Sequence, residues 1–353
     1  MNKNLKDKFF GCIAGVHIGS AMAAPVEGWT YQKIEDTYGK LDKMLPYHHY
    51  PGSTNWKREP GTTEDGVERQ KLIIAAIGRK QGRITAEDLR AVWLSDMNPK
   101  GAGVISEPFE GALLAMAKTP IPARDLGRYC DYAGLVSFAR SCHPIGLINA
   151  GDPKSAQEDV LEVGQVYQTS NSRGLQWASF TAVAIAEATK RAASVSHVLD
   201  AIFEICDISV LPELDRALQL TENCSDFRHL REVFDDLYGG FGMPYAQSYA
   251  NEVVTKAICI FRMVKGNLRD AIVSGVNMGR DTDCITAIAA GISGALTGGL
   301  SLPKEWIQQV DYATSINPHT NSHRTIKEQS DVLYNAFKAR MARLRNYIER
   351  MNY

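Results

Sequence analysis

The amino-acid sequence predicts an all-α fold in which residues 1–353 form a single multi-helix domain. Apolar residues recur at helical spacing in most segments, and the alternating patterns typical of strands are scarce. No internal repeat, glycine-serine linker or charge block divides the chain. With 44% hydrophobic and 22% charged residues, the chain is long enough to bury a large core. A division near "GGFG", residues 239–242, is the alternative, but a loop between helices is the simpler interpretation.

The first predicted helix carries Gly11, Gly15 and Gly19, one on every fourth residue. On a helix these glycines form a bare stripe along which a second backbone can approach closely. The helix should end at "APVEGW", because Pro25 disfavours helical geometry in the residue before it. The same stretch imitates a signal peptide, but His17 and the glycines interrupt its apolar run, so we interpret it as part of the fold.

A long loop follows, because "YPGSTNWKREPG" is rich in proline and glycine. His48 and His49 precede it, and without spaced partners adjacent histidines are more typical of a solvent-facing loop than of a metal site. The next helix is predicted from Thr63, where "TEDGVERQKLIIAAIGRKQG" has a threonine cap, two acids in the first turn and a closing glycine. Further helices are predicted over residues 175–192, 251–265, 268–277 and 326–350.

The segment "NMGRDTDCITAIAAGISGALTG" places Asp281 and Asp283 at the start of another helix. Small residues share one face of that helix and permit close contact with a neighbouring helix: Ala287, Ala290, Gly291, Gly294 and Gly298. Taken alone, the two carboxylates could simply cap the helix and stabilise it through the helix dipole.

A second acid pair, Glu64 and Asp65, lies at the helix start that follows Thr63. If the two helix starts meet, four carboxylates converge and repel one another unless a cation lies among them. Mg²⁺ prefers such oxygen ligands, and Mn²⁺ accepts the same set. The pairs therefore indicate a metal site on the condition that the starts meet.

Four segments, in order along the chain, resemble the ADP-ribosylglycohydrolase family. "GCIAGVHIGSAMAAPVEG" resembles the family's opening glycine-rich helix, and "TEDG" stands where the family carries Thr-Asp-Asp-Thr. "FARSCHPIGL" resembles its Arg-x-x-Pro segment, and "GRDTDCITAIAAGISGALTG" matches its Gly-Asp-x-Asp-Thr helix. The last motif is the most specific, and the shared order strengthens the resemblance.

The resemblance implies a helical fold of the ADP-ribosylglycohydrolase type with two divalent ions, Mg²⁺ or Mn²⁺, in a cleft that binds a terminal ribose. A single ion is the alternative. Carried over residue by residue, one ligand set is Thr63, Glu64 and Asp65, and the other is Asp281 and Asp283.

The implied activity is hydrolysis of the ribosyl C1 N- or O-glycosidic bond of an ADP-ribosylated or smaller ribosyl substrate. Such cleavage passes through an oxocarbenium-like state, which nearby anions stabilise while an activated water attacks the opposite face. Glu27 falls on the acidic position that closes the first motif. Glu27, Glu64 and Asp65 are the candidate catalytic bases, and the sequence does not rank them.

Four residues are candidates for contact with substrate: Arg140, His143, Tyr249 and Arg280. His143 is equally compatible with a hydrogen-bonded loop histidine, and Tyr249 could stack on a base or pack in the core. Arg280 could bind a phosphate or carboxylate of the substrate, or offset a lost metal charge.

The chain departs from the family pattern at positions within the family's metal-site motifs. Ser20 and Glu64 stand where aspartates are usual, Gly66 and Cys284 replace threonines, and Arg280 stands where glycine is common. Glutamate reaches one methylene further than aspartate, which moves a metal or makes its contact indirect. Mg²⁺ prefers oxygen to sulfur, so Cys284 is more typical of a small buried hydrophobe than of a ligand.

The formal net charge of −1 provides no basic excess for nucleic acid or an anionic membrane surface. The expected partner is a small ribosyl or ADP-ribosyl molecule, with an ADP-ribosylated protein as a wider alternative. Seven cysteines without CxxC pairs indicate a reducing, cytoplasmic setting. A non-catalytic ADP-ribose or ribosyl-binding protein with a degenerate metal centre is the alternative function.

Overall fold

The computed structural model describes residues 5–48, 55–101, 104, 108–130, 133–239 and 248–351, with residues 108 and 109 described by their backbone alone. Within this part of the chain the regular elements are helices, and extended pairing is limited to two isolated bridges, Tyr47 with Arg58 and Leu135 with Tyr249. The helices are α1 (Leu5–Ala23), η1 (Ala24–Val26), α2 (Tyr31–Tyr38), α3 (Asp65–Lys80), α4 (Ala86–Asp96), α5 (Pro108–Ala117), η2 (Ala123–Tyr129), α6 (His143–Ile148), α7 (Pro153–Val163), η3 (Gly164–Val166), α8 (Arg173–Ala188), α9 (Val195–Ile205), α10 (Leu211–Leu220), α11 (Phe227–Tyr238), α12 (Ala250–Met263), α13 (Leu268–Val276), α14 (Thr282–Thr297), α15 (Lys304–Ile316) and α16 (Ile326–Met351).

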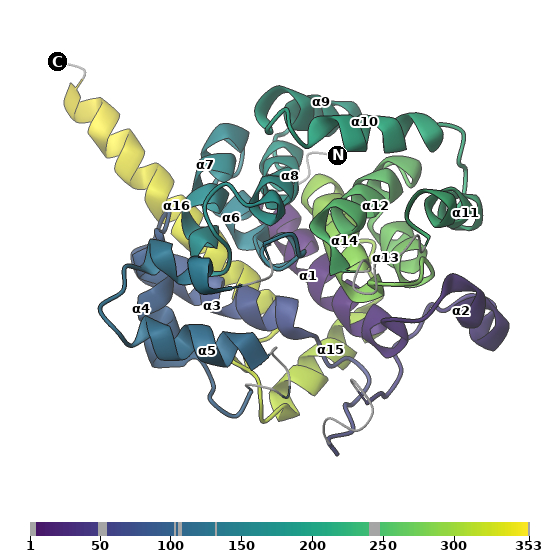
Figure 1. Cartoon of the computed structure of the whole chain (residues 1–353). Coiled ribbons are helices and arrows are strands. Elements are labelled where there is room, and N and C mark those ends of the chain that lie inside the picture. Colours follow the sequence, from purple (N-terminus) through teal and green to yellow (C-terminus); the bar gives the residue numbers. More distant parts are fainter. Residues whose placement is uncertain are drawn as a thin grey trace.

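Helices α1 and α14 pack against each other at the centre of the bundle (Figure 1). Their small-residue stripes face one another, as the sequence predicts. A Cβ atom on Gly294 would lie 2.0 Å from the carbonyl oxygen of Gly11, and one on Gly15 would lie 2.6 Å from that of Ala290. Because no side chain larger than hydrogen fits at these crossings, the glycines set the depth of α14 in the fold.

The other helices cover this central pair. Helices α8, α12 and α13 pack on α14, whereas α3 and α6 contact α16, which also packs on α1. One hydrophobic cluster runs through these layers from Phe9 to Ala336. The second half of α16 extends away from the body of the molecule (Figure 1).

The N-terminal apolar stretch is a core helix. Among the described residues, Leu5–Val26 is the one helical segment long and apolar enough to cross a membrane, and 89% of it is buried inside the protein. Its burial against α14 accounts for its hydropathy.

Several predicted helix boundaries differ from the structure by a few residues. Helix α3 starts at Asp65 with Glu64 at its N-cap, not Thr63, and it ends before Gln81, which is left-handed with φ 56°. The helix predicted over 175–192 is α8, which starts earlier because Ser172 Oγ accepts a hydrogen bond from Leu175 N. His48 is exposed, whereas His49 and residues 240–242 lie outside the described residues.

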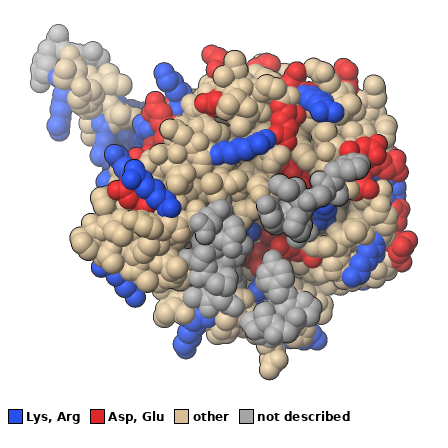
Figure 2. All heavy atoms as spheres, viewed as in Figure 1, with Lys and Arg blue, Asp and Glu red and all other residues tan. Residues whose placement is uncertain are grey.

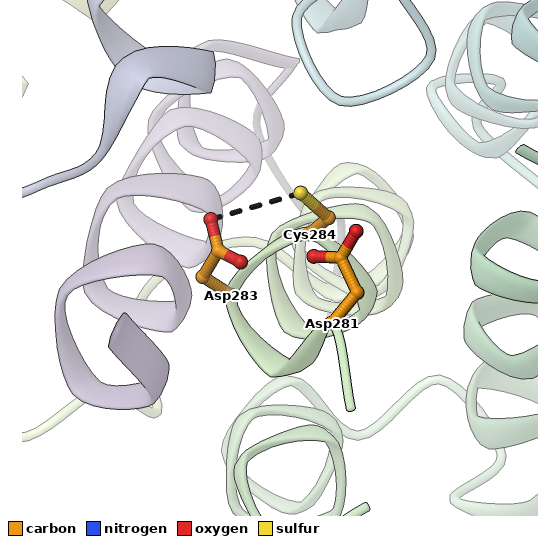
Figure 3. A group of neighbouring side chains, drawn as sticks. All are labelled: Asp281, Asp283 and Cys284. Atoms are coloured by element: carbon orange, nitrogen blue, oxygen red, sulfur yellow. Dashed lines mark hydrogen bonds between the residues drawn. The ribbon is translucent and has the colours of Figure 1, made fainter. Parts of the chain in front are cut away.

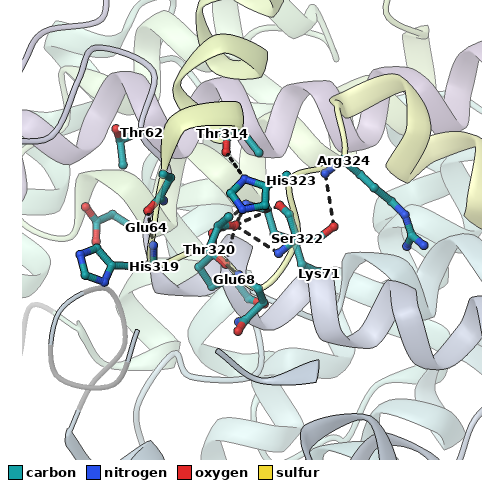
Figure 4. A network of polar contacts seen from close by, with 12 residues as sticks. Thr62, Glu64, Glu68, Lys71, Thr314, His319, Thr320, Ser322, His323 and Arg324 are labelled. Atoms are coloured by element: carbon teal, nitrogen blue, oxygen red, sulfur yellow. Dashed lines mark hydrogen bonds and ion pairs between the residues drawn. The ribbon is translucent and has the colours of Figure 1, made fainter. Parts of the chain in front are cut away.

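A buried ion pair fixes α3 against the chain that joins α15 to α16 (Figure 4). Lys71 Nζ lies 2.7 Å from Glu68 Oε1 and 2.8 Å from Thr320 Oγ1. The backbone N–H of Asn321 donates to Glu68 Oε2 at 2.7 Å. These contacts hold the start of α3 in position for the site described next.

Candidate functional site

Three side chains meet at the start of α14: Asp281, Asp283 and Cys284 (Figure 3). Their oxygen and sulfur atoms lie within 4.8 Å of one another, and all three residues are buried. Cys284 Sγ lies 3.6 Å from Asp283 Oδ2. Figure 2 shows acidic atoms at the centre of the molecular face over this region.

Asp281 and Asp283 are 1% and 3% exposed. Both oxygens of Asp281 and Oδ1 of Asp283 have no hydrogen-bond partner within the described part of the chain. We call these two residues the orphan carboxylates. Asp281 occupies the N-cap position, yet its side chain makes no cap hydrogen bond to the described residues. Helix capping therefore does not explain the pair.

Burial and mutual repulsion disfavour the charged form of this cluster. The pKa of Asp283 is raised well above its usual range by burial and then by the charges of Glu27 and Asp281. Burial and the two aspartates also raise the pKa of the Cys284 thiol, so the sulfur stays protonated at neutral pH. Ionised orphan carboxylates would need a cation in order to be stable.

Glu27 reaches the same place from the end of η1. Two backbone hydrogen bonds position it, since Gly28 N donates to Arg280 O at 2.8 Å and Arg280 N donates to Trp29 O at 2.7 Å. Glu27 is half-buried, and its pKa is raised by burial and then by the charges of Asp281, Glu64 and Asp65. Charges from both helix starts thus act on Glu27, and the guanidinium of Arg140 contacts both Asp65 and Cys284, so the two starts do meet.

Glu64 forms a buried ion pair with Arg58. Its Oε1 accepts hydrogen bonds from Arg58 and Tyr47, and all three side chains are buried. Ser20 Oγ accepts from Glu64 N at 3.2 Å. Sequence reasoning missed Tyr47 and Arg58. Tyr47 precedes the proline- and glycine-rich segment and Arg58 lies within it, and their residue types and spacing match no metal or catalytic motif.

Asp65 is also bound by arginines. Its Oδ2 accepts from Arg140 Nη2 and lies 3.2 Å from Arg69 Nη2. Arg140 Nη1 lies 3.3 Å from Cys284 Sγ, so this one guanidinium links the start of α3 to the start of α14. Arg140, a candidate substrate residue, thus contacts Asp65 of one predicted ligand set and Cys284, which adjoins the other. Thr63 lies buried in the segment before α3.

Arg280 forms its side-chain hydrogen bonds with Glu252. Its backbone is left-handed with φ 66°, a conformation that favours glycine. Its guanidinium binds the carboxylate of Glu252 and lines a pocket of about 300 Å³ between α2, α11 and α12. Tyr31 and Lys256 line the same pocket.

His143 lies inside the protein, whereas Tyr249 is half-buried and packs against the backbone of Gly134. His143 is fully buried: its Nδ1 lies 3.2 Å from Gln70 Nε2, and burial lowers its pKa to about 3. The structure therefore corresponds to the hydrogen-bonded alternative for this residue, with a neutral ring away from any open surface. The ring of Tyr249 lies over Gly134: a Cβ atom added to Gly134 would be 2.7 Å from Cε1 of Tyr249. This contact corresponds to the packing alternative for Tyr249.

The two predicted ligand sets differ in their fit to a metal ion. The orphan carboxylates offer buried oxygens that suit a hard divalent cation such as Mg²⁺ or Mn²⁺. The carboxylates of Glu64 and Asp65 are already bound by guanidinium groups, so this set does not fit a second ion as arranged.

Comparison with known proteins gives the same family as the motifs. The pattern of the ADP-ribosylglycohydrolase family matches residues 1–342. An uncharacterized protein of Archaeoglobus fulgidus is 24% identical over 307 residues, which cover 86% of this chain and 92% of that protein. The uncharacterized protein YegU of Escherichia coli is 23% identical over 348 residues, covering 91% and 99%.

A solved structure named as an ADP-ribosylglycohydrolase-related protein complex has the same fold. Its TM-score is 0.62 at 16% sequence identity, and the match covers 96% of this chain and 99% of that one. The helical architecture expected from the resemblance is thereby confirmed. Since the family pattern spans nearly the whole chain, this protein belongs to the ADP-ribosylglycohydrolase family.

Proposed function

We propose that the protein is a metal-dependent glycosyl hydrolase that cleaves the ribosyl C1 N- or O-glycosidic bond of an ADP-ribosylated or smaller ribosyl substrate. One observation carries the proposal: the orphan carboxylates Asp281 and Asp283 lie buried beside Glu27 at the meeting point of two helix starts. A purely structural helix start would not retain buried oxygens without a donor, because such groups destabilise the fold.

Glu27 is the preferred general base of the three candidates. It is half-buried, and its raised pKa brings it closer to the range in which a carboxylate accepts a proton at neutral pH. Glu64 and Asp65 are each held by an arginine, which keeps their lone pairs engaged. The water oxygen would bond to C1 as the bond to the leaving group breaks, with the water proton passing to Glu27.

The cluster of anions has a second role. Negative charge near the sugar ring stabilises the oxocarbenium-like transition state. A bound Mg²⁺ or Mn²⁺ would hold the ribose hydroxyls in a fixed pose and increase the acidity of water. Asp281 and Asp283 are the residues that would hold it.

The pocket beside the site favours a substrate with an anionic group. One acid, Asp235, lines it beside three cationic side chains: Arg231, Lys256 and Arg280. An ADP-ribosyl or phosphorylated ribosyl group carries such an anion, whether free or attached to a protein. The seven cysteines, which include no CxxC pair, support a reducing, cytoplasmic setting.

Turnover of defined ribosides tests the proposal. Metal-free protein would be incubated with ADP-ribosyl-arginine, ADP-ribosyl-serine and simple nucleosides, each with and without Mg²⁺ or Mn²⁺, and the release of ADP-ribose or ribose measured. We expect release from at least one substrate, only with the ion, and its loss in Asp283→Asn. The control is Asp236→Asn, which neutralises an exposed aspartate on α11.

A non-catalytic ribosyl-binding protein is the second candidate, because arginines hold two of the three predicted bases. Calorimetric titration with ADP-ribose distinguishes the two functions. Tight binding without turnover of any substrate would favour the binding protein, whereas ion-dependent turnover would exclude it.

A further inference from the structure

We propose that this site takes one divalent cation, at the orphan carboxylates, and that the guanidinium groups of Arg58 and Arg140 permanently replace a second ion. The inference rests on the proposed function and concerns the same site. It differs from the two-ion centre that the family resemblance implies, and three features of the structure support it.

The first feature is the distribution of charge. Of the five acids at the meeting point, Glu64 is paired with Arg58 and Asp65 with Arg140. Asp281 and Asp283 have oxygens without a donor in the described chain. One divalent cation at these aspartates compensates their two negative charges, whereas a second ion would compete with arginines already in contact with their carboxylates.

The second feature is the space that Arg140 occupies. A Cβ atom on Gly66 would lie 3.0 Å from Arg140 Cδ and 3.1 Å from its Cγ, so a threonine here would push the arginine away. Cys284 presents its sulfur to Arg140 Nη1 at 3.3 Å. Gly66 and Cys284 both stand where the family carries threonine, and both touch the same arginine.

The third feature is the position of Glu64. Its carboxylate meets Arg58 and the hydroxyl of Tyr47. Arg58 is also held by Val104, whose carbonyl oxygen accepts from Nη2 at 2.6 Å. An aspartate at this position would be one methylene shorter and would bring its carboxylate back towards the helix start. The departures at residues 64, 66 and 284 therefore act together to seat two guanidinium groups.

Manganese binding tests the inference without any activity assay. Metal-free protein would be titrated with Mn²⁺, and the bound ion followed by electron paramagnetic resonance. We expect one Mn²⁺ per chain, with a spectrum free of coupling between two manganese ions. Asp283→Asn should weaken binding by more than the about 10- to 100-fold that outer-shell substitutions cause.

A variant that restores the family pattern tests the residues themselves. In the triple variant Glu64→Asp, Gly66→Thr, Cys284→Thr we expect two Mn²⁺ per chain and a coupled spectrum. Cys259→Thr, which alters another buried cysteine, is the matched control and should bind one ion. Far-ultraviolet circular dichroism establishes that each variant is folded.

The outcomes separate this inference from the proposed function. Two coupled ions in the unmodified protein would overturn the one-ion assignment and leave hydrolysis untouched. No ion at all would refute the proposed metal dependence as well. A folded triple variant that still binds one ion would refute the role given to these three residues; if the variant does not fold, the stoichiometry of the unmodified protein decides.

Discussion

The guanidinium of Arg280 and the carboxylate of Glu252 form two hydrogen bonds, of 2.6 Å from Nε to Oε1 and 2.9 Å from Nη2 to Oε2. The same carboxylate lies 2.6 Å from Lys256 Nζ. Arg280 directly precedes Asp281, yet its side-chain hydrogen bonds are to Glu252 on α12. It also lines the neighbouring pocket.

Arg280→Gly should change substrate affinity and leave ion binding intact. The lost ion pair and the relieved left-handed strain oppose each other, so stability should change by no more than about 1 kcal/mol. We expect KM for phosphate-bearing ribosyl substrates to rise about tenfold, equivalent to about 1.4 kcal/mol, and KM for uncharged ribosides to stay constant. Steady-state kinetics measure this. Lys265→Gly is the control, because Lys265 is also left-handed but is exposed and lies outside this pocket.

Glu27→Gln and Glu64→Gln should have opposite signatures. Without its proton acceptor, Glu27→Gln should lose about 10²- to 10⁴-fold in kcat while retaining ion binding and thermal stability. Glu64→Gln leaves the buried Arg58 without its carboxylate and should destabilise the fold by about 3–5 kcal/mol. Rate measurements and denaturant unfolding distinguish them. Equal loss of rate in both variants at full stability would contradict the assignment of Glu27 as base.

The stabilisation by a divalent ion should increase with pH. Folding raises the pKa of Glu27 and Asp283 above their ordinary values near 4.5 and 3.8, so the folded chain binds their protons more tightly than the unfolded chain. Without an ion, these two groups stabilise the fold fully at pH values below their ordinary pKa values. This stabilisation is lost as the pH rises through their raised pKa values in the folded chain. Each pKa unit corresponds to about 1.4 kcal/mol.

Thermal unfolding with and without Mn²⁺, from about pH 5 to about pH 8, measures this effect. The increase in Tm caused by the ion should be larger at the upper end of the range. Asp283→Asn, which cannot ionise at this position, should lose most of that pH dependence. An ion-induced shift that is constant across the range in the unmodified protein would contradict the burial argument.

Gly294→Ala should disrupt the contact between α1 and α14. Its new Cβ would lie 2.0 Å from the carbonyl oxygen of Gly11, so the two helices would have to separate. We expect a loss of about 1–3 kcal/mol or more, measured by denaturant unfolding. Gly111→Ala on α5 is the control, since among the described residues no heavy atom beyond its chain neighbours and its own helix backbone lies within 4 Å of its added Cβ; it should gain up to about 1 kcal/mol.

The sequence by itself determined the helical architecture and the place of the site. Glycine spacing on α1 and the small face of α14 predicted their close contact, because helical periodicity is a local property of the chain. The acid pairs at the starts of α3 and α14 likewise marked the candidate site, since charge and motif are read directly from residue order. The predicted helix boundaries differ by a few residues, because end geometry depends on what the cap side chains contact.

Only the tertiary structure decided which carboxylates are paired with arginine and which have oxygens without a hydrogen-bond donor among the described residues. Arg140 contacts both Asp65 and Cys284, which lie 75 and 144 positions away from it in the sequence. Arg58 donates a hydrogen bond to Glu64, six positions further along the chain. Asp65 and Asp283 look alike in the sequence, yet one is paired with arginine and the other is not hydrogen-bonded at Oδ1 by any described residue. Charge pairing acts over contact distances that the fold alone sets, so local sequence pattern identifies the acids but not their partners.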